Sequence, residues 1–302
     1  MEIIFLGTGG CVPTEDRGLP ATAIDYLGEL MLFDCGEGTQ RQMRIADLNF
    51  MRLNHVFLTH LHADHYLGLG GMIQSMEFLE REKDLNIYGP PGTKKTIEGL
   101  ISLGTFNLKS FKLNVLDIEP GIVFDGKKFQ VTCTKSIHTK GSLAYCVEEK
   151  PKRKFLKKKA LDLGIPEGRL FSKLQKGEEV AVKGKKFTPD MVLGKPVAGR
   201  KVVISGDTRY SKNIVELAGG ADVLIHEATY SVEDKDRLVD CNHSTTQQAA
   251  ETALKADVKQ LYMVHLSQRY TEPEKLEEEA RKIFPESYVA KDFQKIKIES
   301  HW

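Results

Sequence analysis

The sequence is poor in features that define several large classes of protein. It has 5 cysteines in 302 residues, an odd number, and no two of them form a CxxC pair. Disulfide frameworks and structural zinc knuckles both need paired cysteines, so we expect neither and predict reduced thiols. No apolar run approaches the roughly 20 residues that cross a bilayer. The amino terminus has no basic region before its short apolar stretch, so we expect no secretory or transit signal, no membrane partner and a cytoplasmic location.

Net charge is also nearly absent, because 43 lysines and arginines balance 42 aspartates and glutamates. This balance is the average of two opposite regions. Residues 150–201 contain 16 basic and 5 acidic side chains, a net charge of +11, and the rest of the chain carries −10. The sequence therefore joins an acidic body to a basic insert, a separation that the overall composition conceals.

Apolar runs of strand-like composition alternate with helical patterns along the body, separated by glycine-rich or polar turns. We predict strands at residues 2–6, 22–26, 30–34, 55–59, 113–118, 129–134, 201–205, 222–225 and 260–264, and helices at residues 71–82, 93–103, 214–217, 246–255 and from Pro273. Strands outnumber helices, and both halves of the chain contain strands followed by helices. This order predicts an α/β (α+β) fold in which two packed sheets have helices outside them.

The basic insert, residues 150–201, interrupts this alternation. A short helix is expected from Lys154 to Leu163, ended by the turn Gly164-Ile165-Pro166-Glu167-Gly168. Glycine, proline and lysine dominate the remainder, so we expect a long and weakly structured stretch. Inside a compact domain such a stretch is usually functional or disordered, and a solvated lysine-rich loop is the simpler alternative.

The strongest chemical signal is Thr59-His60-Leu61-His62-Ala63-Asp64-His65, which directly follows an apolar strand. Imidazole and carboxylate groups are common ligands of zinc and similar ions. In a tight turn, His60 and His62 can face one ion while Asp64 and His65 face a neighbouring one. The alternative is a polar surface loop, but chance rarely assembles such a pattern at a strand end.

One cluster supplies too few ligands for two ions, so more are expected after other strands. His138, Asp207 and His265 each follow an apolar run. Any one of them alone is more simply a structural polar residue, but their shared placement favours a common site. A carboxylate such as Asp207 can bridge two cations, and two metals about 3.5–4 Å apart can stabilise both the attacking and the leaving oxygen of a hydrolysis.

This HxHxDH cluster with later His, Asp and His residues resembles the metallo-β-lactamase superfamily of dinuclear zinc hydrolases, and the likeness extends over the whole chain, including the turn Leu6-Gly7-Thr8-Gly9-Gly10. The resemblance implies a four-layer αββα sandwich, formed as a single domain over residues 1–302. It also implies two zinc ions per subunit, although the same donors suit other divalent ions such as manganese. The implied ligands are His60, His62, His138 and Asp207 for one ion, and Asp64, His65, Asp207 and His265 for the other.

The string Phe33-Asp34-Cys35-Gly36-Glu37-Gly38-Thr39-Gln40-Arg41-Gln42 resembles the amino-terminal signature of ribonuclease Z, an endoribonuclease family that trims precursor tRNA at the 3′ side. Asp34 is then expected to accept the other N–H of a ligand histidine and fix its tautomer, the alternative being a cap on the glycine-rich turn. The resemblance implies a 3′-hydroxyl on the tRNA, a 5′-phosphate on the trailer and a homodimer. The sequence indicates no other protein partner.

Two further strings, His226-Glu227-Ala228-Thr229 and His243-Ser244-Thr245, are similar to a paired Glu and HxT loop of the same family. The resemblance implies that His243 protonates the leaving 3′-oxygen, that Glu227 orients it, and that Asp64 ligates metal and accepts the proton of the attacking water. Judged alone, His243 would instead be a cap for the helix that begins at Thr246. The remaining histidines, His55, His226 and His301, are expected to be structural or surface residues.

The insert coincides with a protruding arm of this family, and its turn at residues 164–168 resembles the GxPxG element of that arm. The resemblance implies a tRNA-binding exosite, because lysines attract phosphates without sequence preference and folded RNA is recognised largely by shape. The expected contacts are Lys152, Arg153, Lys154, Lys157, Lys158, Lys159, Gly164, Pro166 and Gly168. Two alternatives remain: a zinc hydrolase of small esters, thioesters or lactones, which leaves the arm without a role, and a non-catalytic RNA-binding protein, which leaves a full ligand set unused.

Overall fold

The computed structural model describes residues 1–236 and 241–301, and the chain divides into two compact units. One unit comprises residues 1–148 and 201–299, and the other comprises residues 149–200 with the carboxyl-terminal residues from Ser300. Each unit has a hydrophobic core of its own. Within the described residues, no helix combines the length and the apolar character needed to cross a bilayer.

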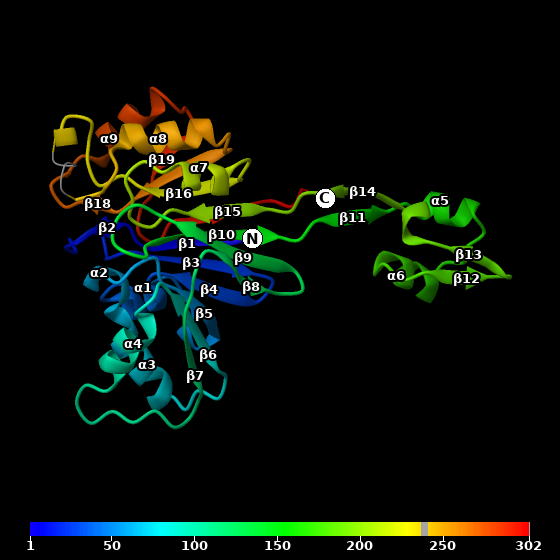
Figure 1. The fold of residues 1–302 in the computed structure, drawn as a ribbon, viewed down its shortest axis with the longest axis horizontal. Helices are drawn as coiled ribbons and strands as arrows, with labels where there is room; N and C mark the ends of the chain where they lie inside the picture. Colours follow the sequence, from blue (N-terminus) through cyan, green and yellow to red (C-terminus); the bar gives the residue numbers. More distant parts are fainter. Residues whose placement is uncertain (237–240, 302) are drawn as a thin grey trace. The chain divides into compact units, whose positions relative to one another are not determined.

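In the described part of the first unit, two seven-stranded sheets form the centre (Figure 1). The first sheet has the order β20-β1-β3-β4-β5-β6-β7, with β1 Glu2–Gly7, β3 Ala21–Tyr26, β4 Glu29–Phe33, β5 Leu53–Phe57, β6 Leu85–Gly89, β7 Leu113–Asp117 and β20 Lys295–Lys297. The second has the order β19-β17-β16-β15-β10-β9-β8, with β8 Gly121–Asp125, β9 Phe129–Lys135, β10 Leu143–Glu149, β15 Lys201–Ile204, β16 Val223–Glu227, β17 Gln260–Val264 and β19 Ser287–Val289. Two short strands, β2 Gly9–Gly10 and β18 Leu266–Ser267, pair in parallel with each other.

The main core lies between the two sheets, because each contributes inward-facing apolar side chains. Phe33 and Phe57 of the first sheet stack with ring centroids 5.0 Å apart, and Tyr145 of the second packs against both. Burial alternates along β9, as expected for a strand with one face on a core. By contrast, β16 is buried at every position and β17 at its central ones, which explains their nearly continuous apolar sequences.

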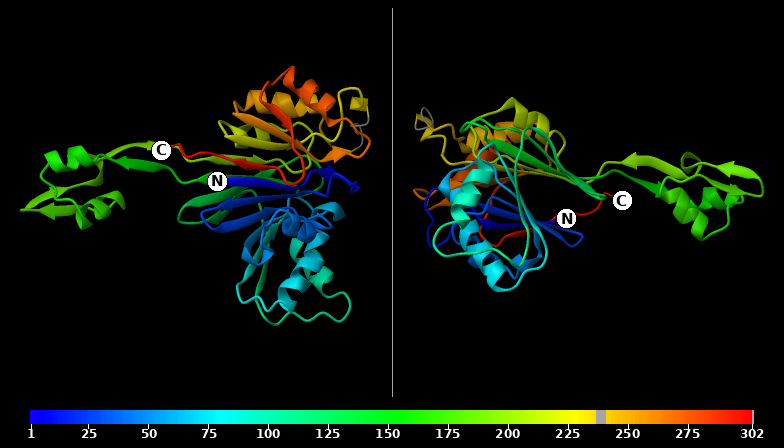
Figure 2. Two further views of the ribbon diagram at one scale, coloured as in Figure 1. Left: turned by 180° about the vertical axis from the view of Figure 1, so that it is seen from behind. Right: turned by 60° about the horizontal axis from the view of Figure 1, so that its bottom comes forward.

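Helices cover the outer face of each sheet (Figures 1 and 2). The first sheet carries α1 Thr39–Ile45, α3 Gly68–Phe78 and α4 Thr93–Ile101. The short helix α2 Ala63–Tyr66 and the 3-10 turn Phe50–Arg52 lie near these helices in the sequence. The second sheet carries α7 Lys212–Ala218, α8 Thr246–Lys255 and α9 Pro273–Arg281. Helix α3 ends earlier than its apolar spacing predicts, because Glu80 adopts a positive φ of 54°. The predicted order of helices outside two packed sheets is confirmed.

The second unit is a small folded module. Its elements are β11 Lys152–Phe155, α5 Lys157–Asp162, α6 Arg169–Gln175, β12 Val180–Val182, β13 Lys185–Phe187, the 3-10 turn Pro189–Met191 and β14 Leu193–Val197. Strand β11 pairs antiparallel with β14, and β12 pairs antiparallel with β13. Their core consists of Ala160, Ile165, Leu174, Val180, Phe187 and Val192. The expectation of a weakly structured remainder is therefore wrong, because apolar residues scattered among the lysines converge on one small core.

Local backbone geometry explains two details of this unit. The helix expected from Lys154 begins at Lys157 instead, because residues 152–155 extend to pair with β14. Lys183 and Gly184 join β12 to β13 with φ values of 48° and 77°. Positive φ at both positions is what a two-residue hairpin loop requires, and glycine adopts it without strain.

The insert begins and ends on neighbouring strands. Strands β10 and β15 pair antiparallel, with Glu148 opposite Lys201. Beyond this pair, the fully buried carboxylate of Glu149 accepts hydrogen bonds from Arg200 Nε at 2.8 Å and from Lys152 Nζ at 2.8 Å. The two chain segments are therefore joined both by backbone pairing and by a carboxylate that bridges them.

Candidate metal centre and active site

The predicted metal ligands, Asp34 and Glu227 lie at or after the carboxyl ends of strands, whereas His243 lies just before α8. Residues 60–65 follow β5, Asp34 follows β4, His138 follows β9, Asp207 follows β15, Glu227 ends β16 and His265 follows β17. Strands β15, β16 and β17 run parallel, so the residues that follow them meet at one edge of the sheet. The short helix α2, with His62 at its N-cap, turns the chain sharply enough to direct side chains from both ends of the 60–65 segment into the site.

The first candidate ligand group consists of His60, His62, His138 and Asp207, whose donor atoms all lie within 4.8 Å of one another. Nε2 of His138 is 3.1 Å from Nδ1 of His62. Oδ2 of Asp207 is 3.6 Å from Nε2 of His60 and 3.7 Å from Nε2 of His138. Four donors from three separate loops thus converge on one point.

The second candidate group shares Asp207 with the first. Its Oδ2 is 3.4 Å from Nε2 of His65 and 3.2 Å from Nε2 of His265. Oδ2 of Asp64 is 3.5 Å from each of the same two nitrogens. The structure therefore brings all seven predicted ligands together, with Asp207 at the position of a bridging carboxylate.

The donor atoms fit divalent cations. Nε2 of His60, His65 and His265 is buried without a hydrogen-bond partner, although buried polar atoms are nearly always paired. Ligands about 2.0–2.1 Å from a tetrahedral zinc ion lie about 3.3 Å from one another. The separations above run from 3.1 to 3.7 Å. Each group could therefore hold a metal ion, which would give the unpaired nitrogens a partner.

The electrostatics of the cluster keep its donors available. Burial, followed by the charge of His65, lowers the pKa of His60 to about 2, so this imidazole is neutral. Burial would raise the pKa of Asp207, but the charges of His265 and His65 hold it well below its usual range. The central carboxylate is therefore ionised.

Asp34 lies behind the second group and contacts His65. Its Oδ2 is 2.8 Å from Nδ1 of His65 and accepts the hydroxyl of Thr59 at 2.8 Å. Oδ1 accepts the backbone N–H of Thr59 at 2.8 Å. In the neutral ring that a metal ion requires, Nδ1 donates to this carboxylate and the lone pair of His65 lies on Nε2, the atom that faces Asp207.

Glu227 and His243 form a buried pair beside the ligands. Nδ1 of His243 is 2.8 Å from Oε1 of Glu227, which also accepts the backbone N–H of Thr208 at 2.8 Å. Burial lowers the pKa of His243, but the charge of Glu227 and its hydrogen bond outweigh that effect and raise the pKa to about 9. Helix α8 is instead capped by Thr245, whose side chain accepts the N–H of Gln248 in a capping box. The geometry thus gives His243 a partner in the site rather than the capping role.

Two residues of the site were not singled out from the sequence. Thr229 donates its hydroxyl to Oε2 of Glu227 at 2.6 Å, and its Oγ1 is 2.9 Å from Nδ1 of His265. Its position two residues after Glu227, on the same side of an extended chain, was the available signal. Cys11 donates its backbone N–H to Oδ2 of Asp64 at 3.0 Å. Burial, with the charges of Asp64 and Asp207, raises the pKa of its thiol to about 11.

The remaining histidines have separate surroundings. His55 is buried in the core, where it packs against Phe124 with ring centroids 4.5 Å apart. His226 is fully buried, and its Nδ1 is 2.7 Å from the carbonyl oxygen of Glu227. His301 is exposed, with Nδ1 3.1 Å from the carbonyl oxygen of Ala198.

Several of the predicted arm contacts make ion pairs within the second unit. Nη1 of Arg153 is 2.6 Å from Asp190, and its Nε donates to the carbonyl oxygen of Gly194 at 2.8 Å, which ties β11 to β14. Lys157 donates to Glu167 at 2.6 Å, and Lys152 to Glu149 as described above.

Other predicted arm contacts remain open to solvent. Lys154, Lys158 and Lys159 are exposed. Gly164 and Gly168 have φ values of 76° and 127°, in the region that favours glycine, and Pro166 lies between them in the turn after α5. The exposed lysines are therefore the better candidates for contact with an external anion.

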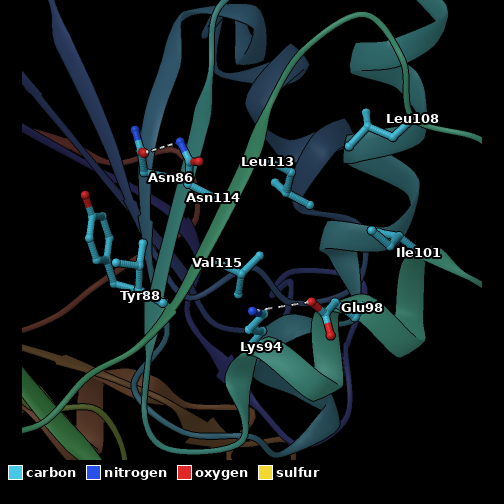
Figure 3. A pocket seen from close by; sticks show the side chains of 10 residues that line it. Asn86, Tyr88, Lys94, Glu98, Ile101, Leu108, Leu113, Asn114 and Val115 are labelled. Atoms are coloured by element: carbon cyan, nitrogen blue, oxygen red, sulfur yellow. Dashed lines mark hydrogen bonds and ion pairs between the residues drawn. The ribbon is translucent and has the colours of Figure 1, made fainter.

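The larger cavities lie away from the ligand cluster. One of about 660 Å³ lies between the edge strand β7 and helix α4, where Lys94 pairs with Glu98 and Asn114 donates to Asn86 (Figure 3). Another of about 830 Å³ lies within the second unit and includes Lys154, Phe155 and Lys176. A void of about 30 Å³, large enough for a water molecule, adjoins Asp34, His65 and Asp207.

Comparison with known proteins connects this geometry to a reaction class. The profile of a family described as Anti-Pycsar protein Apyc1 matches residues 1–152. Ribonuclease Z of Methanothermobacter thermautotrophicus is 44% identical over 301 residues, covering 100% of this chain and 98% of that protein. Ribonuclease Z of Bacillus subtilis is 40% identical over 305 residues, covering 99% of each. The chain belongs to the ribonuclease Z family. It is accordingly an endoribonuclease, as the string at residues 33–42 predicted.

Solved structures agree with this membership. The short form of human tRNase Z has 28% sequence identity and a TM-score of 0.73, covering 99% of this chain and 100% of that one. A metallo-β-lactamase fold protein of Bacillus subtilis, 19% identical, has a TM-score of 0.70 with 98% of each chain covered, and shares the fold. The predicted metallo-β-lactamase αββα sandwich is therefore confirmed for this ribonuclease Z.

Proposed function

We propose that the protein is a zinc-dependent endoribonuclease that cleaves precursor tRNA at its 3′ side, leaving a 3′-hydroxyl on the tRNA and a 5′-phosphate on the trailer. The observation that carries this proposal is a ligand set for two cations beside the Glu227–His243 pair, in a chain that matches ribonuclease Z over its full length. The likeness to human tRNase Z supports tRNA as the substrate. The proposed location is the cytoplasm, as expected for a protein that acts on precursor tRNA.

Two zinc ions are the proposed cofactors, with manganese as the alternative that the same donors allow. His60, His62, His138 and Asp207 would hold one ion, and Asp64, His65, Asp207 and His265 the other. Bound there, the ions would lower the pKa of the attacking water and offset negative charge at the scissile phosphate. Asp34 and Thr229 would orient the two histidines of the second set, because Asp34 contacts Nδ1 of His65 and Thr229 contacts Nδ1 of His265.

Two side chains are proposed to move protons. Asp64 would accept the proton of the attacking water. Burial tends to raise its pKa, but the approach of His265, whose Nε2 is 3.5 Å away, and the charge of His65 keep it well below its usual value, so the carboxylate is ionised and has a free lone pair for a proton. His243 would donate a proton to the leaving 3′-oxygen. Since its Nδ1 is occupied by Glu227, the donating atom is Nε2.

The basic insert is proposed to hold the RNA away from the bond that breaks. Its net charge of +11 suits a polyanion, whereas a small ester or lactone would gain nothing from it. Exposed Lys154, Lys158 and Lys159 are the first candidates for phosphate contacts. The acidic remainder of the chain, at −10, would not attract RNA by itself, so the insert accounts for binding and the metal centre for chemistry.

A homodimer is also proposed. Phe78 and Leu79, at the end of α3, leave 86% and 51% of their surface exposed. Large apolar side chains exposed side by side often mark a surface that another protein covers. Light scattering on the wild type and on Phe78→Ser tests this idea, and a wild-type mass of one chain at micromolar concentration would contradict it.

The function is tested with a precursor tRNA labelled at both ends and carrying a 3′ trailer. Wild type loaded with zinc should release one trailer fragment, whose 5′-phosphate is detected by its ligation to an acceptor RNA. Asp207→Asn should bind fewer ions and lose cleavage, whereas Glu227→Gln should keep its ions and lose most of the rate. Glu98→Gln, on the exposed face of α4, is the matched control and should behave as wild type. Cleavage of a small phosphodiester without cleavage of the precursor would refute the assignment of substrate.

A further inference from the structure

Cys11 follows a backbone pairing that brings the start of the chain to the second ligand group. Strand β2 pairs in parallel with β18, with Gly9 opposite Leu266 and Gly10 opposite Ser267. His265 immediately precedes β18, so its ring packs directly on β2. A Cβ built on Gly10 would lie 2.5 Å from Nδ1 of His265, which shows how closely the backbone approaches the imidazole.

The thiol of Cys11 shares a donor cluster with two of the candidate ligands. Its Sγ, a carboxylate oxygen of Asp64 and a ring nitrogen of His265 all lie within 4.8 Å of one another. The backbone N–H of Cys11 donates to Oδ2 of Asp64 at 3.0 Å, which fixes the loop against that carboxylate. Cys11 itself is exposed, so solvent ions reach it.

A second observation points to a ligand at this position. Only 2% of the surface of His265 is exposed, and its Nε2 has no hydrogen-bond partner. This nitrogen faces Asp64 at 3.5 Å. An unpaired imidazole nitrogen, a carboxylate and a thiol within one small volume form a mixed N/O/S donor set, which borderline-soft cations such as zinc, cobalt and cadmium prefer.

We propose that Cys11 is an additional thiolate ligand at the second ion position, and that it makes this position selective for thiophilic divalent cations over manganese and magnesium. The inference rests on the proposed metal centre and adds one soft donor to its four hard and borderline ones. Zinc accepts a fifth ligand readily, so Cys11 need not displace Asp64. Binding exchanges the thiol proton for the metal–sulfur bond and releases that proton to solvent.

Cobalt(II) provides a readout that does not depend on catalysis, because cobalt bound to a thiolate absorbs in the near ultraviolet through sulfur-to-metal charge transfer. Metal-free full-length protein is titrated with cobalt while absorbance is recorded, and bound cobalt is counted by equilibrium dialysis. The wild type should show the charge-transfer band as the second equivalent binds. Cys11→Ser should bind cobalt without the band. Cys241→Ser, which removes the thiol two residues from His243, should keep it.

Selectivity provides the second measurement. The ratio of cadmium to manganese affinity at the second position should fall about tenfold or more in Cys11→Ser, because a thiolate favours the softer ion. Bound cadmium should also protect Cys11 from alkylation by iodoacetamide, as mapped by peptide mass spectrometry, whereas magnesium should not.

The outcomes separate this inference from the function on which it rests. If wild type binds two cobalt ions without a charge-transfer band, or if the band survives Cys11→Ser, the thiolate assignment is overturned and the metal centre stands. If no cobalt binds at all, the proposed metal centre fails and the role of Cys11 fails with it.

Discussion

The contact between Asp34 and His65 allows a sharp prediction about the second ion. In Asp34→Asn one amide oxygen replaces Oδ1 and can still accept the backbone N–H of Thr59. The NH₂ group then replaces Oδ2, so it faces Nδ1 of His65 at about the observed 2.8 Å. Two donors cannot share that contact, and the ring resolves the conflict by moving its proton to Nε2. The lone pair needed by the ion is thereby lost.

The expected loss of metal affinity follows from removing the carboxylate that orients His65. Removing the group that orients a ligand histidine typically weakens metal affinity 10–100-fold, about 1.4–2.8 kcal/mol. Zinc affinities are measured by competition with a chromophoric chelator and fitted to two sites. The second site should weaken by this factor and the first should be nearly unchanged, because Asp34 contacts no ligand of the first group other than through Thr59.

The substitution is well controlled by the backbone. Asp34 has a positive φ of 56°, a conformation that asparagine adopts as readily as aspartate, so the change tests the side chain rather than the turn. Asp47 has a φ of 57° and is exposed, which makes Asp47→Asn the matched control. Nitrogen NMR of the metal-free protein, recorded at a pH above the raised pKa of His65, should show the altered tautomer of its neutral ring. A folded Asp34→Asn variant that holds both ions within twofold of wild type would refute the reasoning.

Three further predictions follow from the same structure. Glu227→Gln should lower the cleavage rate by about 10²–10⁴-fold with both ions retained. Because Glu227 raises the pKa of His243 to about 9, its loss should also move the alkaline limb of the pH–rate profile to lower pH. An unmoved limb would contradict the assignment of His243 as the acid. Replacing residues 150–201 by a short Gly/Ser linker should sharply reduce cleavage of precursor tRNA but not of a small phosphodiester, and should flatten the salt dependence of tRNA binding. The linker can be accommodated because β10 and β15 remain neighbours, with Val147 opposite Val202. Equal retention on both substrates would remove the insert from the proposal. Chelating the metals should lower the melting temperature by roughly 5–10 °C relative to protein in free zinc at 100 times its dissociation constant. Calorimetry with and without added zinc measures this shift. An unchanged melting temperature would contradict a metal that stabilises the folded state.

Much of the site could be predicted because its chemistry is concentrated in short strings. Four candidate ligands fall between His60 and His65, and strand-end placement was enough to add His138, Asp207 and His265. Thr229 and Cys11 were harder to find. Threonine and a lone cysteine carry no signal by themselves, and their contacts depend on pairings between distant segments, such as β2 with β18.

The same distinction applies to the fold. A fully buried strand such as β16 shows in the sequence through its run of apolar residues, whereas the edge strands β19 and β20 have only three residues each and gain their conformation from neighbours. In the insert, α6 has Leu170, Phe171 and Leu174 at helical spacing, a pattern masked by the surrounding lysines and glycines. Short elements of this kind are stable through tertiary contacts, which local sequence does not reveal.

The buried bridge at Glu149 has an evolutionary consequence. Because the insert starts and finishes on adjacent, hydrogen-bonded strands, and has a core separate from that of the sheets, its length and sequence can diverge without moving a catalytic loop. On the proposed function, mutations in the insert would change which RNA is captured, while the strands of the two sheets would continue to position the residues that cut it. Substrate range and reaction chemistry are thus inherited as separable traits within one chain.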